Sequence, residues 1–586
     1  MTSGLPLTDP GPVGGAIPAA PVPADPLPPA ARRALPPAAR RALPLLAVIG
    51  AGAALRLVLA YLVFPGQGLS SDLGLFEEWA STLARVGPGS FYAASPSANY
   101  PPAYLYVLWL IGAVGAPLGS VLGTSSSHAV LLLLKVPAMA ADIGIAVLLY
   151  RAAGRWFGGR AGLLAAALYF FVPVTWYDSA LWGQVDAVGT LVMLAAVLLL
   201  IDGWSEPAVA LAAFSVLVKP QDAIVLVVVI PVLVRRHLLR AGSGPVPVLG
   251  PRLAALDRRL GGLLLEQGPA RLGTSAVVAG LALILPIVPF DIARFGPAAL
   301  ADVPVLGQLG GLAGLYASAG GEFAVLTANA YNAWALVGAN PLAAAIGTQG
   351  GSWTPDSLVV LGGVPAVMVA SGLLILVGLM VAGGLLLRDD RLAIVLGFAL
   401  AAFAFYTLPT RVHERYLFPF FAAAALLVSG AAARALAYGI VGVANAINIH
   451  AVLAAPLSIG ASLRSGGGDG SASGFAGRAG AQGTAGIPPG IGGPGGGDGV
   501  PGGVGGTGGG HGVASIHLPL ADLARSEPVV IAVALGQTLA LGVLVVAWVA
   551  VVLQPVLDRR FTGASERGRR AGATGSAASG VTDGGR

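Results

Sequence analysis

The sequence predicts an all-α polytopic integral membrane protein with about twelve transmembrane helices. Of its 586 residues, 56% are hydrophobic and only 10% are charged, whereas soluble domains carry roughly 25% charged residues. The apolar runs are long, are rich in Leu, Val and Ala, and lack the alternation of strands, which favours helices over a barrel. Most Arg residues lie in short segments beside these runs, which is typical of cytoplasmic loops.

Composition also excludes several kinds of chemistry. The chain has no cysteine, so a disulfide, a thiol nucleophile and a thiolate metal site are impossible. The pI near 9.7 would suit a nucleic-acid partner, but the placement of the Arg residues indicates membrane topology instead, and we expect no nucleic acid. Neither a P-loop nor an H-E-x-x-H motif is present. We expect no cofactor, although Asp and Glu residues leave a divalent cation open.

The chain is predicted to divide into five parts. Its Pro- and Ala-rich beginning indicates a disordered cytoplasmic tail rather than a signal peptide. A Gly-rich stretch at 464–512 has no apolar periodicity and indicates a flexible loop. The predicted parts are a tail at 1–43, a membrane region with the candidate site at 44–460, a low-complexity loop at 461–527, a final helix at 528–553 and a second cytoplasmic tail at 554–586.

Twelve apolar runs are predicted to cross the membrane. They are 44–64, 128–150, 161–175, 182–202, 207–218, 220–234, 272–290, 357–387, 391–408, 416–436, 437–460 and 528–553. The run 103–118 is also apolar, but counting it as a span would move the basic segment 151–160 outside. We therefore interpret it as an interfacial or re-entrant helix. With this topology both termini are cytoplasmic, and 65–127, 291–356 and 409–415 are external.

The first external segment carries an amphipathic pattern between Ser70 and Arg85. Its apolar residues recur at helical spacing, with Phe76 and Trp79 at the centre of the stripe, while Asp72 lies off the stripe. We expect an amphipathic helix that could lie in the membrane interface.

The unusual polar residues of the chain converge on the external face in this topology. They are Asp72, Asn99, Tyr100, Trp182, Gln184, Asp186, Lys219, Gln221, Asn329, Tyr331, Asn332, Arg411, His413, Glu414 and Arg415. Ionisable groups at a membrane edge are costly unless they meet water, a partner or a charged ligand. Because the convergence depends on the chosen topology, it tests consistency and is not independent proof.

Several of these side chains also have an ordinary structural interpretation. Asp72 follows two serines and precedes an apolar helix, as a helix N-cap would. Trp182 suits an interfacial anchor, with Asp186 as a cap, and Lys219 suits a snorkelling side chain. The cluster 411–415 suits contact with anionic lipid headgroups.

The functional interpretation assigns chemistry to the same side chains. Asp72 would be a general base whose pKa is raised by a shielded cleft. Gln184 and Asp186 would bind sugar hydroxyls, and Lys219 would contact phosphate. Arginine offers bidentate donors matched to phosphate, and histidine can donate when neutral or charged, which gives the same role to Arg411, His413 and Arg415.

At these residues the chain resembles the GT-C superfamily of membrane glycosyltransferases. It looks most similar to bacterial mannosyltransferases of the PIG-V type and to eukaryotic dolichyl-phosphate-glucose-dependent glucosyltransferases. Six pieces in family order, between about 65 and 420, carry the resemblance: Asp72 with Phe76 and Trp79, Asn99-Tyr100-Pro101-Pro102, Trp182-Gly183-Gln184-Val185-Asp186, Lys219-Pro220-Gln221, Asn329-Ala330-Tyr331-Asn332-Ala333-Trp334, and Val412-His413-Glu414-Arg415-Tyr416-Leu417-Phe418-Pro419.

The resemblance implies transfer of a sugar, mannose or another hexose, from a polyprenyl-phosphate donor to a glycolipid, glycan or protein at the outer face, with inversion. It implies that Asp72 is the catalytic base and that His413 steadies the donor phosphate. The remaining substrate-binding residues would be Tyr100, Gln184, Asp186, Gln221, Asn329, Tyr331, Asn332 and Glu414. Membrane lipids are expected to surround the protein.

Two departures from the family pattern matter. Asn99 stands where an acidic residue is usual, and the Gly-rich stretch and final helix fall outside the resemblance. Two other kinds of protein stay open: a multi-spanning transporter or lipid flippase, and a non-enzymatic scaffold. A transporter should show inverted repeats and charges at mid-membrane, but no repeat is visible and the polar residues gather at one face.

Overall fold

The computed structural model describes residues 37–239, 251–259, 268–321, 323–337, 354–428, 432–454, 516 and 518–555. The chain forms two compact units, Met1–Pro44 and Leu45–Arg586. The first is described only at 37–44, where helix α1 begins. Most of the predicted N-terminal tail, the Gly-rich stretch 464–512 and nearly all of the C-terminal tail lie outside the described residues.

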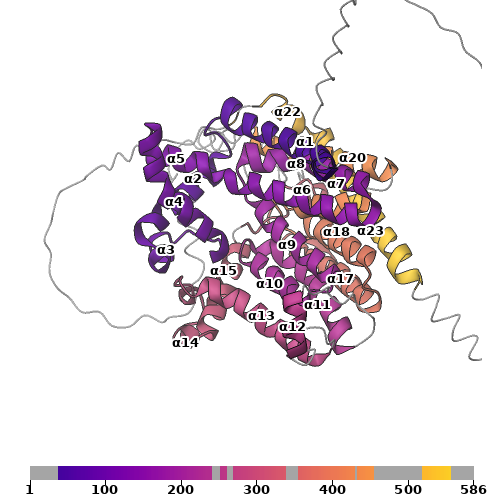
Figure 1. Cartoon of the computed structure of the whole chain (residues 1–586). Coiled ribbons are helices and arrows are strands. Elements are labelled where there is room, and N and C mark those ends of the chain that lie inside the picture. The colour runs from indigo at the N-terminus through magenta and orange to yellow at the C-terminus, as the bar shows by residue number, and fades with distance from the viewer. Residues whose placement is uncertain are drawn as a thin grey trace, which may run out of the picture. The chain divides into compact units, whose positions relative to one another are not determined.

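The described residues are helical almost throughout, which confirms the all-α prediction (Figure 1). The α-helices are α1 (Pro37–Leu57), α2 (Ser70–Val86), α3 (Pro88–Ala94), α4 (Pro102–Leu122), α5 (Ser126–Leu134), α6 (Val136–Phe157), α7 (Gly159–Phe171), α8 (Pro173–Trp176), α9 (Asp186–Ile201), α10 (Ser205–Val216), α11 (Leu226–Leu233), α12 (Pro251–Arg259), α13 (Pro269–Ile287), α14 (Ala298–Ala301), α15 (Leu306–Gly321), α17 (Ala366–Leu387), α18 (Arg391–Thr407), α19 (Phe418–Val428), α20 (Ala432–Leu453), α22 (Ala521–Ala524) and α23 (Glu527–Trp548).

Short 3₁₀ and π segments continue or connect these helices. The π segments are η1 (Val58–Val63), η2 (Tyr177–Trp182), η4 (Val234–Leu238) and η7 (Val549–Leu553), and the 3₁₀ segments are η3 (Pro220–Val225), η5 (Ala293–Phe295) and η6 (Ala333–Leu336). Two short strands, β1 (Val359–Leu361) and β2 (Val364–Pro365), pair antiparallel just before α17. Gly362 and Gly363 form their turn at φ of 53° and 90°, where glycine carries no steric penalty.

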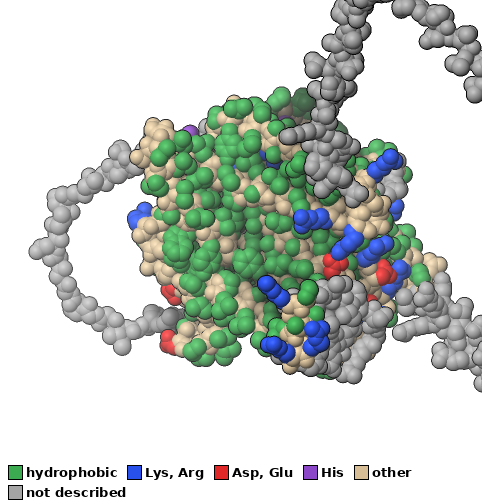
Figure 2. Space-filling view, viewed as in Figure 1, with side chains coloured by type: hydrophobic (Ala, Val, Ile, Leu, Met, Phe, Trp, Pro, Cys, Tyr) green, Lys and Arg blue, Asp and Glu red, His purple; other side chains and the backbone are tan. Residues whose placement is uncertain are grey.

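Seven helices of the described residues are long and apolar enough to cross a membrane, so the protein is polytopic. They are Leu43–Val63, Pro102–Leu122, Ser126–Phe157, Pro269–Ile287, Ala366–Leu387, Ala433–Leu453 and Glu527–Leu553. The face shown in Figure 2 is largely covered by hydrophobic side chains, with most Lys and Arg gathered at its right-hand and lower parts. A surface of this kind suits contact with lipid.

The other six predicted spans are short, bent or divided in the structure. Four correspond to the apolar helices Asp186–Ile201, Ser205–Val216, Arg391–Thr407 and Phe418–Val428. The predicted span 161–175 is a pair of helices bent by 51° at Pro173, because proline lacks the N–H that would continue the helix. The predicted span 220–234 is divided among η3, α11 and η4.

Helix α4 differs from the interfacial helix expected at 103–118. It has 21 residues, enough to cross a membrane, and packs on α2 and α5. A Cβ at Gly112 would lie 2.0 Å from the Ala80 carbonyl oxygen, so glycine permits this close approach of α4 to α2. If α4 crosses the membrane, the segments after it change sides, so the sidedness of the protein stays a prediction.

The predicted amphipathic helix is present as α2, and its apolar stripe is buried in protein. Phe76 and Trp79 are each 2% exposed and form an aromatic cluster with Tyr100 and Tyr104. The stripe packs on α4 and α5, so it faces protein, and a position of the helix in the membrane interface stays a prediction. This packing fixes Asp72, in the first turn of α2, against the rest of the fold.

A buried ion pair that the sequence analysis did not identify joins α1 to α6. Arg56 Nε lies 2.7 Å from Asp142 Oδ2, and both side chains are fully buried. The remaining guanidinium donors reach the carbonyls of Gly52 and Phe170 and the Thr175 hydroxyl, while Tyr169 and Ser179 donate to the carboxylate. A buried charge pair needs such complete hydrogen bonding to be tolerated. It anchors α8 and η2, which lead to Trp182.

Helices α18 and α19 lie in the core and are buried on nearly all sides. A helix that is apolar all round belongs in an interior. The connection between them contains the polar segment Arg411 to Tyr416. Both ends of this segment are therefore joined to buried helices. Hydrogen bonds from Ala328 N–H to the Val412 carbonyl and from Asn445 to the Glu414 carbonyl fix it further.

Candidate active site

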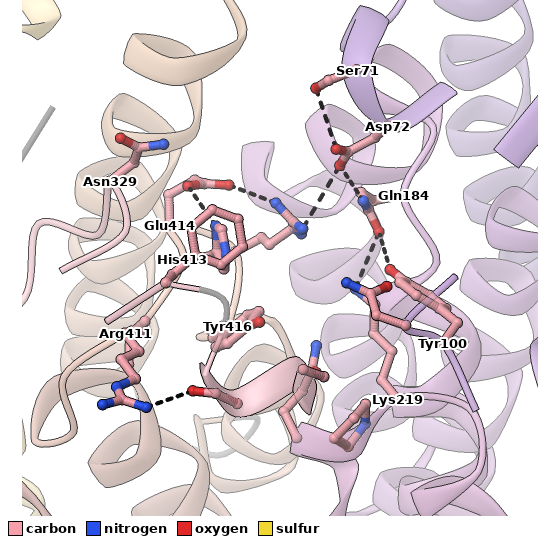
Figure 3. A pocket seen from close by; sticks show the side chains of 18 of the residues that line it. Ser71, Asp72, Tyr100, Gln184, Lys219, Asn329, Arg411, His413, Glu414 and Tyr416 are labelled. Atoms are coloured by element: carbon pink, nitrogen blue, oxygen red, sulfur yellow. Dashed lines mark hydrogen bonds and ion pairs between the residues drawn. The ribbon is translucent and has the colours of Figure 1, made fainter. Parts of the chain in front are cut away.

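A cavity of about 560 Å³ brings together polar side chains from distant parts of the chain. In Figure 3, Asp72, Gln184, Tyr100 and Lys219 lie on one side, and Asn329, His413, Glu414 and Arg411 lie on the other. The first side comes from α2 and the segments before α4, α9 and η3. The second comes from the segments between α15 and η6 and between α18 and α19.

Asp72 holds its two carboxylate oxygens in different environments. Its Oδ2 accepts a 2.9 Å hydrogen bond from Trp182 Nε1 and a second from Gln184 Nε2, and Arg415 Nη2 lies 3.7 Å away. Its Oδ1 accepts only a long contact of 3.4 Å from the Ser71 hydroxyl. One oxygen is therefore held by the protein while the other is left for a ligand.

The pKa of Asp72 is lowered, which contradicts the expected rise. Burial alone would raise the pKa of this carboxyl, but the nearby Arg415 charge and the hydrogen bonds from Trp182 and Gln184 outweigh it. The predicted rise took only the burial of the carboxyl into account. The hydrogen-bond donors Trp182 and Gln184 lie more than 100 positions from Asp72 in the sequence. Asp72 is therefore ionised at neutral pH and able to accept a proton.

The structural interpretations of four side chains do not hold. Helix α2 has Leu69 at its N-cap with no side-chain cap, so Asp72 is not a capping residue. Trp182 is 1% exposed and so is no interfacial anchor. Lys219 is 3% exposed and is bonded within the protein, so it does not snorkel to water. Asp186, the first residue of α9, makes no side-chain cap either.

Lys219 is bonded to two acceptor groups of the protein. Its ammonium nitrogen lies 3.1 Å from Gln184 Oε1 and 3.0 Å from each oxygen of Asp186. An ammonium donates through its N–H groups, so the amide oxygen and the carboxylate together hold it in place. The bond to Oε1 sets the orientation of the Gln184 amide, so that its NH₂ group points to Asp72.

Arg415 lies between three carboxylates. Its Nη1 donates to Glu414 Oε1 at 2.9 Å, its Nε lies 3.6 Å from Asp186 Oδ2, and its Nη2 faces Asp72. The guanidinium carbon sits 5.1 Å above the centre of the Trp182 ring, which favours a cation. The side chain is 11% exposed and lines the cavity.

His413 and Glu414 lie next to each other on the cavity wall. Phe323 packs edge-on against the imidazole at 4.8 Å between ring centres. Burial and the nearby Arg415 charge lower the pKa of His413 to about 3, so the ring is neutral at pH 7. Burial raises the pKa of Glu414 above its ordinary value, although Arg415 opposes that rise.

Arg411 points to the outer rim of the same wall. Its Nε donates to Asp356 Oδ2 at 2.6 Å and its Nη1 to the Gly320 carbonyl at 2.7 Å. The residue has a φ of 67°, a strained value for a side chain other than glycine. The pair with Asp356, together with the Thr410 hydroxyl, stabilises that turn.

The remaining residues expected at the site separate into two groups. Tyr100, Gln221 and Asn329 line the cavity. The side chains of Tyr331 and Asn332 do not: the Tyr331 hydroxyl donates to the Ala524 carbonyl, and Asn332 caps η6. Their contribution is structural, because they position the segment that begins at Asn329.

Aromatic residues that the sequence analysis did not select also line the cavity. Tyr316 comes from α15, Phe323 follows that helix, and Phe405 and Tyr416 come from either side of the polar segment. No local pattern distinguishes them from other aromatic residues in apolar runs. Among the described residues no group of three or more His, Asp or Glu side chains is arranged to hold a metal ion.

No protein-family model and no curated protein sequence matches this chain. Two solved structures are similar to parts of it. ArnT from Cupriavidus metallidurans bound to undecaprenyl phosphate shares 15% sequence identity with a TM-score of 0.38, over 70% of this chain and 66% of that one. The Archaeoglobus fulgidus oligosaccharyltransferase in its apo form shares 15% identity with a TM-score of 0.32, over 72% of this chain and 52% of that one.

The chain thus spans less than two thirds of the length of each of these structures. Both likenesses are partial and distant, so the interpretation of the cavity rests on its own residues.

Proposed function

We propose that the protein is a membrane glycosyltransferase that moves a sugar from a polyprenyl-phosphate donor to a hydroxyl group of the acceptor. The observation that carries this proposal is the arrangement of Asp72. One carboxylate oxygen is fixed by Trp182 and Gln184, and the other has only a long 3.4 Å contact with the Ser71 hydroxyl. A single positioned carboxylate suits removal of a proton from an attacking hydroxyl.

The lining of the cavity supports a sugar as the transferred group. Aromatic rings and polar groups share the wall, and five buried polar atoms of the described lining residues have no hydrogen-bond partner within the protein. They include Gln221 Nε2, a donor, and Asn329 Oδ1, an acceptor. Sugar hydroxyls both donate and accept, so they suit a wall that offers both kinds of atom, whereas a purely apolar ligand would leave them unpaired.

The donor phosphate is best placed near Arg415. Its guanidinium lines the cavity beside His413 and offers the planar donors that match phosphate oxygens. Arg411, at the rim, is a second candidate. Lys219 is already bonded to Gln184 and Asp186, so we assign it to positioning Gln184 rather than to the phosphate. In this arrangement Arg415 would stabilise charge on the leaving phosphate as the glycosyl bond breaks.

Inversion at the sugar carbon follows from the same arrangement. A phosphate leaving group needs little acid assistance, so one carboxylate on the acceptor side suffices, unlike the paired carboxylates of glycoside hydrolases. The proposal includes a hexose such as mannose, a glycolipid, glycan or protein acceptor, and an active site at the outer face of the membrane.

Purified protein in detergent with a panel of polyprenyl-phosphate sugars tests the proposal. Transfer to an acceptor is expected with at least one donor, and an Asp72→Asn variant should lose it. If no donor of the panel is consumed by folded protein, while lipid or solute moves across a reconstituted bilayer, the chain is a transporter instead.

A further inference from the structure

The cations around the cavity are already compensated by carboxylates. Three cations line it and four carboxylates surround them, one of which, Asp72, is held mainly by neutral donors. The other pairs are Lys219 with Asp186 at 3.0 Å, Arg411 with Asp356 at 2.6 Å, and Arg415 with Glu414 at 2.9 Å. An anionic ligand therefore enters a site that has no excess positive charge.

Glu414 is the carboxylate of this set that is least well held. Its side chain is 1% exposed, and its Oε1 accepts a hydrogen bond from Arg415. Its Oε2 is buried at the cavity wall without a hydrogen-bond partner, and His413 Nδ1 is 4.0 Å away. A buried anionic oxygen without a donor is costly, and a proton on it removes that cost.

The groups that face Glu414 come from several elements. Arg415 favours its ionised form, whereas the carboxylate of Asp72 on α2 disfavours it. His413 is neutral at pH 7 and offers no compensating charge. The hydroxyls of Tyr406 on α18 and of Tyr331 are also near, and Asn445 on α20 donates to the Glu414 carbonyl rather than to its carboxylate. Glu414 therefore depends on the Arg415 cation and on a backbone hydrogen bond to stay ionised.

We infer that binding of an anionic phosphodiester at Arg415 is coupled to uptake of one proton by Glu414. The proton comes from solvent and adds to the Glu414 carboxylate, whose negative charge is lost. Nη1 of Arg415 is then free to donate to a phosphate oxygen in place of Oε1. One negative charge arrives and one disappears, so the net charge of the buried site does not change. This inference rests on the proposed function only in taking the donor to be a phosphodiester.

The first test measures proton uptake in the wild-type protein. The probe is citronellyl methyl phosphodiester, which has no second phosphate ionisation, so that any pH dependence belongs to the protein. Titration calorimetry at pH 7 in PIPES and in Tris should give binding enthalpies that differ by the ionisation enthalpy of the buffer. The Kd should rise with pH, approaching about tenfold per pH unit where a full proton is taken up.

Two variants distinguish proton uptake by Glu414 from the general effect of removing one negative charge near the cavity. Glu414→Gln is permanently uncharged and keeps an acceptor for Arg415, so it should bind the probe more tightly than wild type at pH 8, with a Kd independent of pH. Asp356→Asn also removes one negative charge near the cavity, but it leaves Glu414 intact. It should keep both the pH dependence and the buffer-dependent enthalpy. If Glu414→Gln does not fold, the calorimetry on wild type decides.

The outcomes are distinguishable. Binding of the probe with the same enthalpy in both buffers and a flat Kd overturns the inference and leaves the proposed function intact. Proton uptake that persists in Glu414→Gln also overturns it, because another group then takes the proton. If folded wild-type protein does not bind the phosphodiester at all, the proposed function fails and the inference fails with it.

Discussion

The indole nitrogen of Trp182 donates a 2.9 Å hydrogen bond to Asp72 Oδ2 across 110 positions of sequence. This bond and the one from Gln184 turn Asp72 so that its second oxygen is left at the cavity. The same bonds lower the pKa of Asp72. The geometry that makes this carboxylate available thus also makes it a weaker base than the sequence analysis expected.

Replacement of Asp72 by Asn tests the base directly. Asn keeps the shape and can still accept from Trp182, but it cannot take the acceptor proton. Loss of a general base typically costs about 10²–10⁴-fold in rate. We expect the variant to fold and bind donor normally while kcat collapses by that amount in a purified transfer assay. Turnover close to wild type would leave the mechanism without a named base.

Replacement of Lys219 by Met separates positioning from phosphate binding. Without the ammonium, the Gln184 amide is free to turn away from Asp72. A hydrogen bond to a charged group is worth roughly 1.5–3 kcal/mol, which corresponds to a fall in kcat of about ten- to a hundredfold. The donor Kd should stay within about twofold. A large loss of donor affinity at unchanged kcat would return Lys219 to the phosphate site.

We expect kcat to show no change with pH that reflects titration of a histidine. Because the pKa of His413 is lowered to about 3, the ring stays neutral down to low pH. The pKa of Asp72 is also below its ordinary value, so its carboxylate stays ionised across the pH range in which a histidine would titrate. We expect kcat to be flat between about pH 5 and 8. A limb in kcat near pH 6.5 would show that a neutral His413 is incorrect.

Loss of the buried ion pair between Arg56 and Asp142 should lower the free energy of unfolding more than loss of an exposed ion pair. Arg56→Met leaves the Asp142 carboxylate buried without its partner, which typically costs roughly 3–5 kcal/mol. The matched control is Arg155→Met, in which the Asp202 partner is 36% exposed and the expected loss is about 0–1 kcal/mol. Thermal unfolding in detergent measures both. Equal shifts would contradict the buried network.

Topology can be measured by cysteine labelling, because the native chain contains no cysteine. The Arg asymmetry places 151–160, 235–271 and 388–391 in the cytoplasm. A single cysteine at position 155 should react with a membrane-impermeant reagent only after the cells are opened. Labelling in intact cells would contradict this topology and would agree with an α4 that crosses the membrane.

The sequence by itself determined the class of protein and the local elements. Composition decides which solvent surrounds a chain, so an apolar chain with few charges predicted a polytopic helical protein. Helical periodicity is local, so the amphipathic helix α2 with its apolar stripe around Phe76 and Trp79 was predicted correctly, whereas the burial of that stripe in protein was not predicted. The residues Asp72, His413 and Arg415 were selected because charge beside apolar runs is costly.

Only the tertiary structure decided which of these groups meet and what their contacts do. Three features depend on partners that helix packing brings together. They are the lowered pKa of Asp72, the bond of Lys219 to Asp186, and the hydrogen bond of the Tyr331 hydroxyl to the Ala524 carbonyl. The partners of such contacts lie tens to hundreds of positions apart, and no local period encodes them. Ionisation depends on distances of a few ångströms between those partners, which the packed fold alone sets.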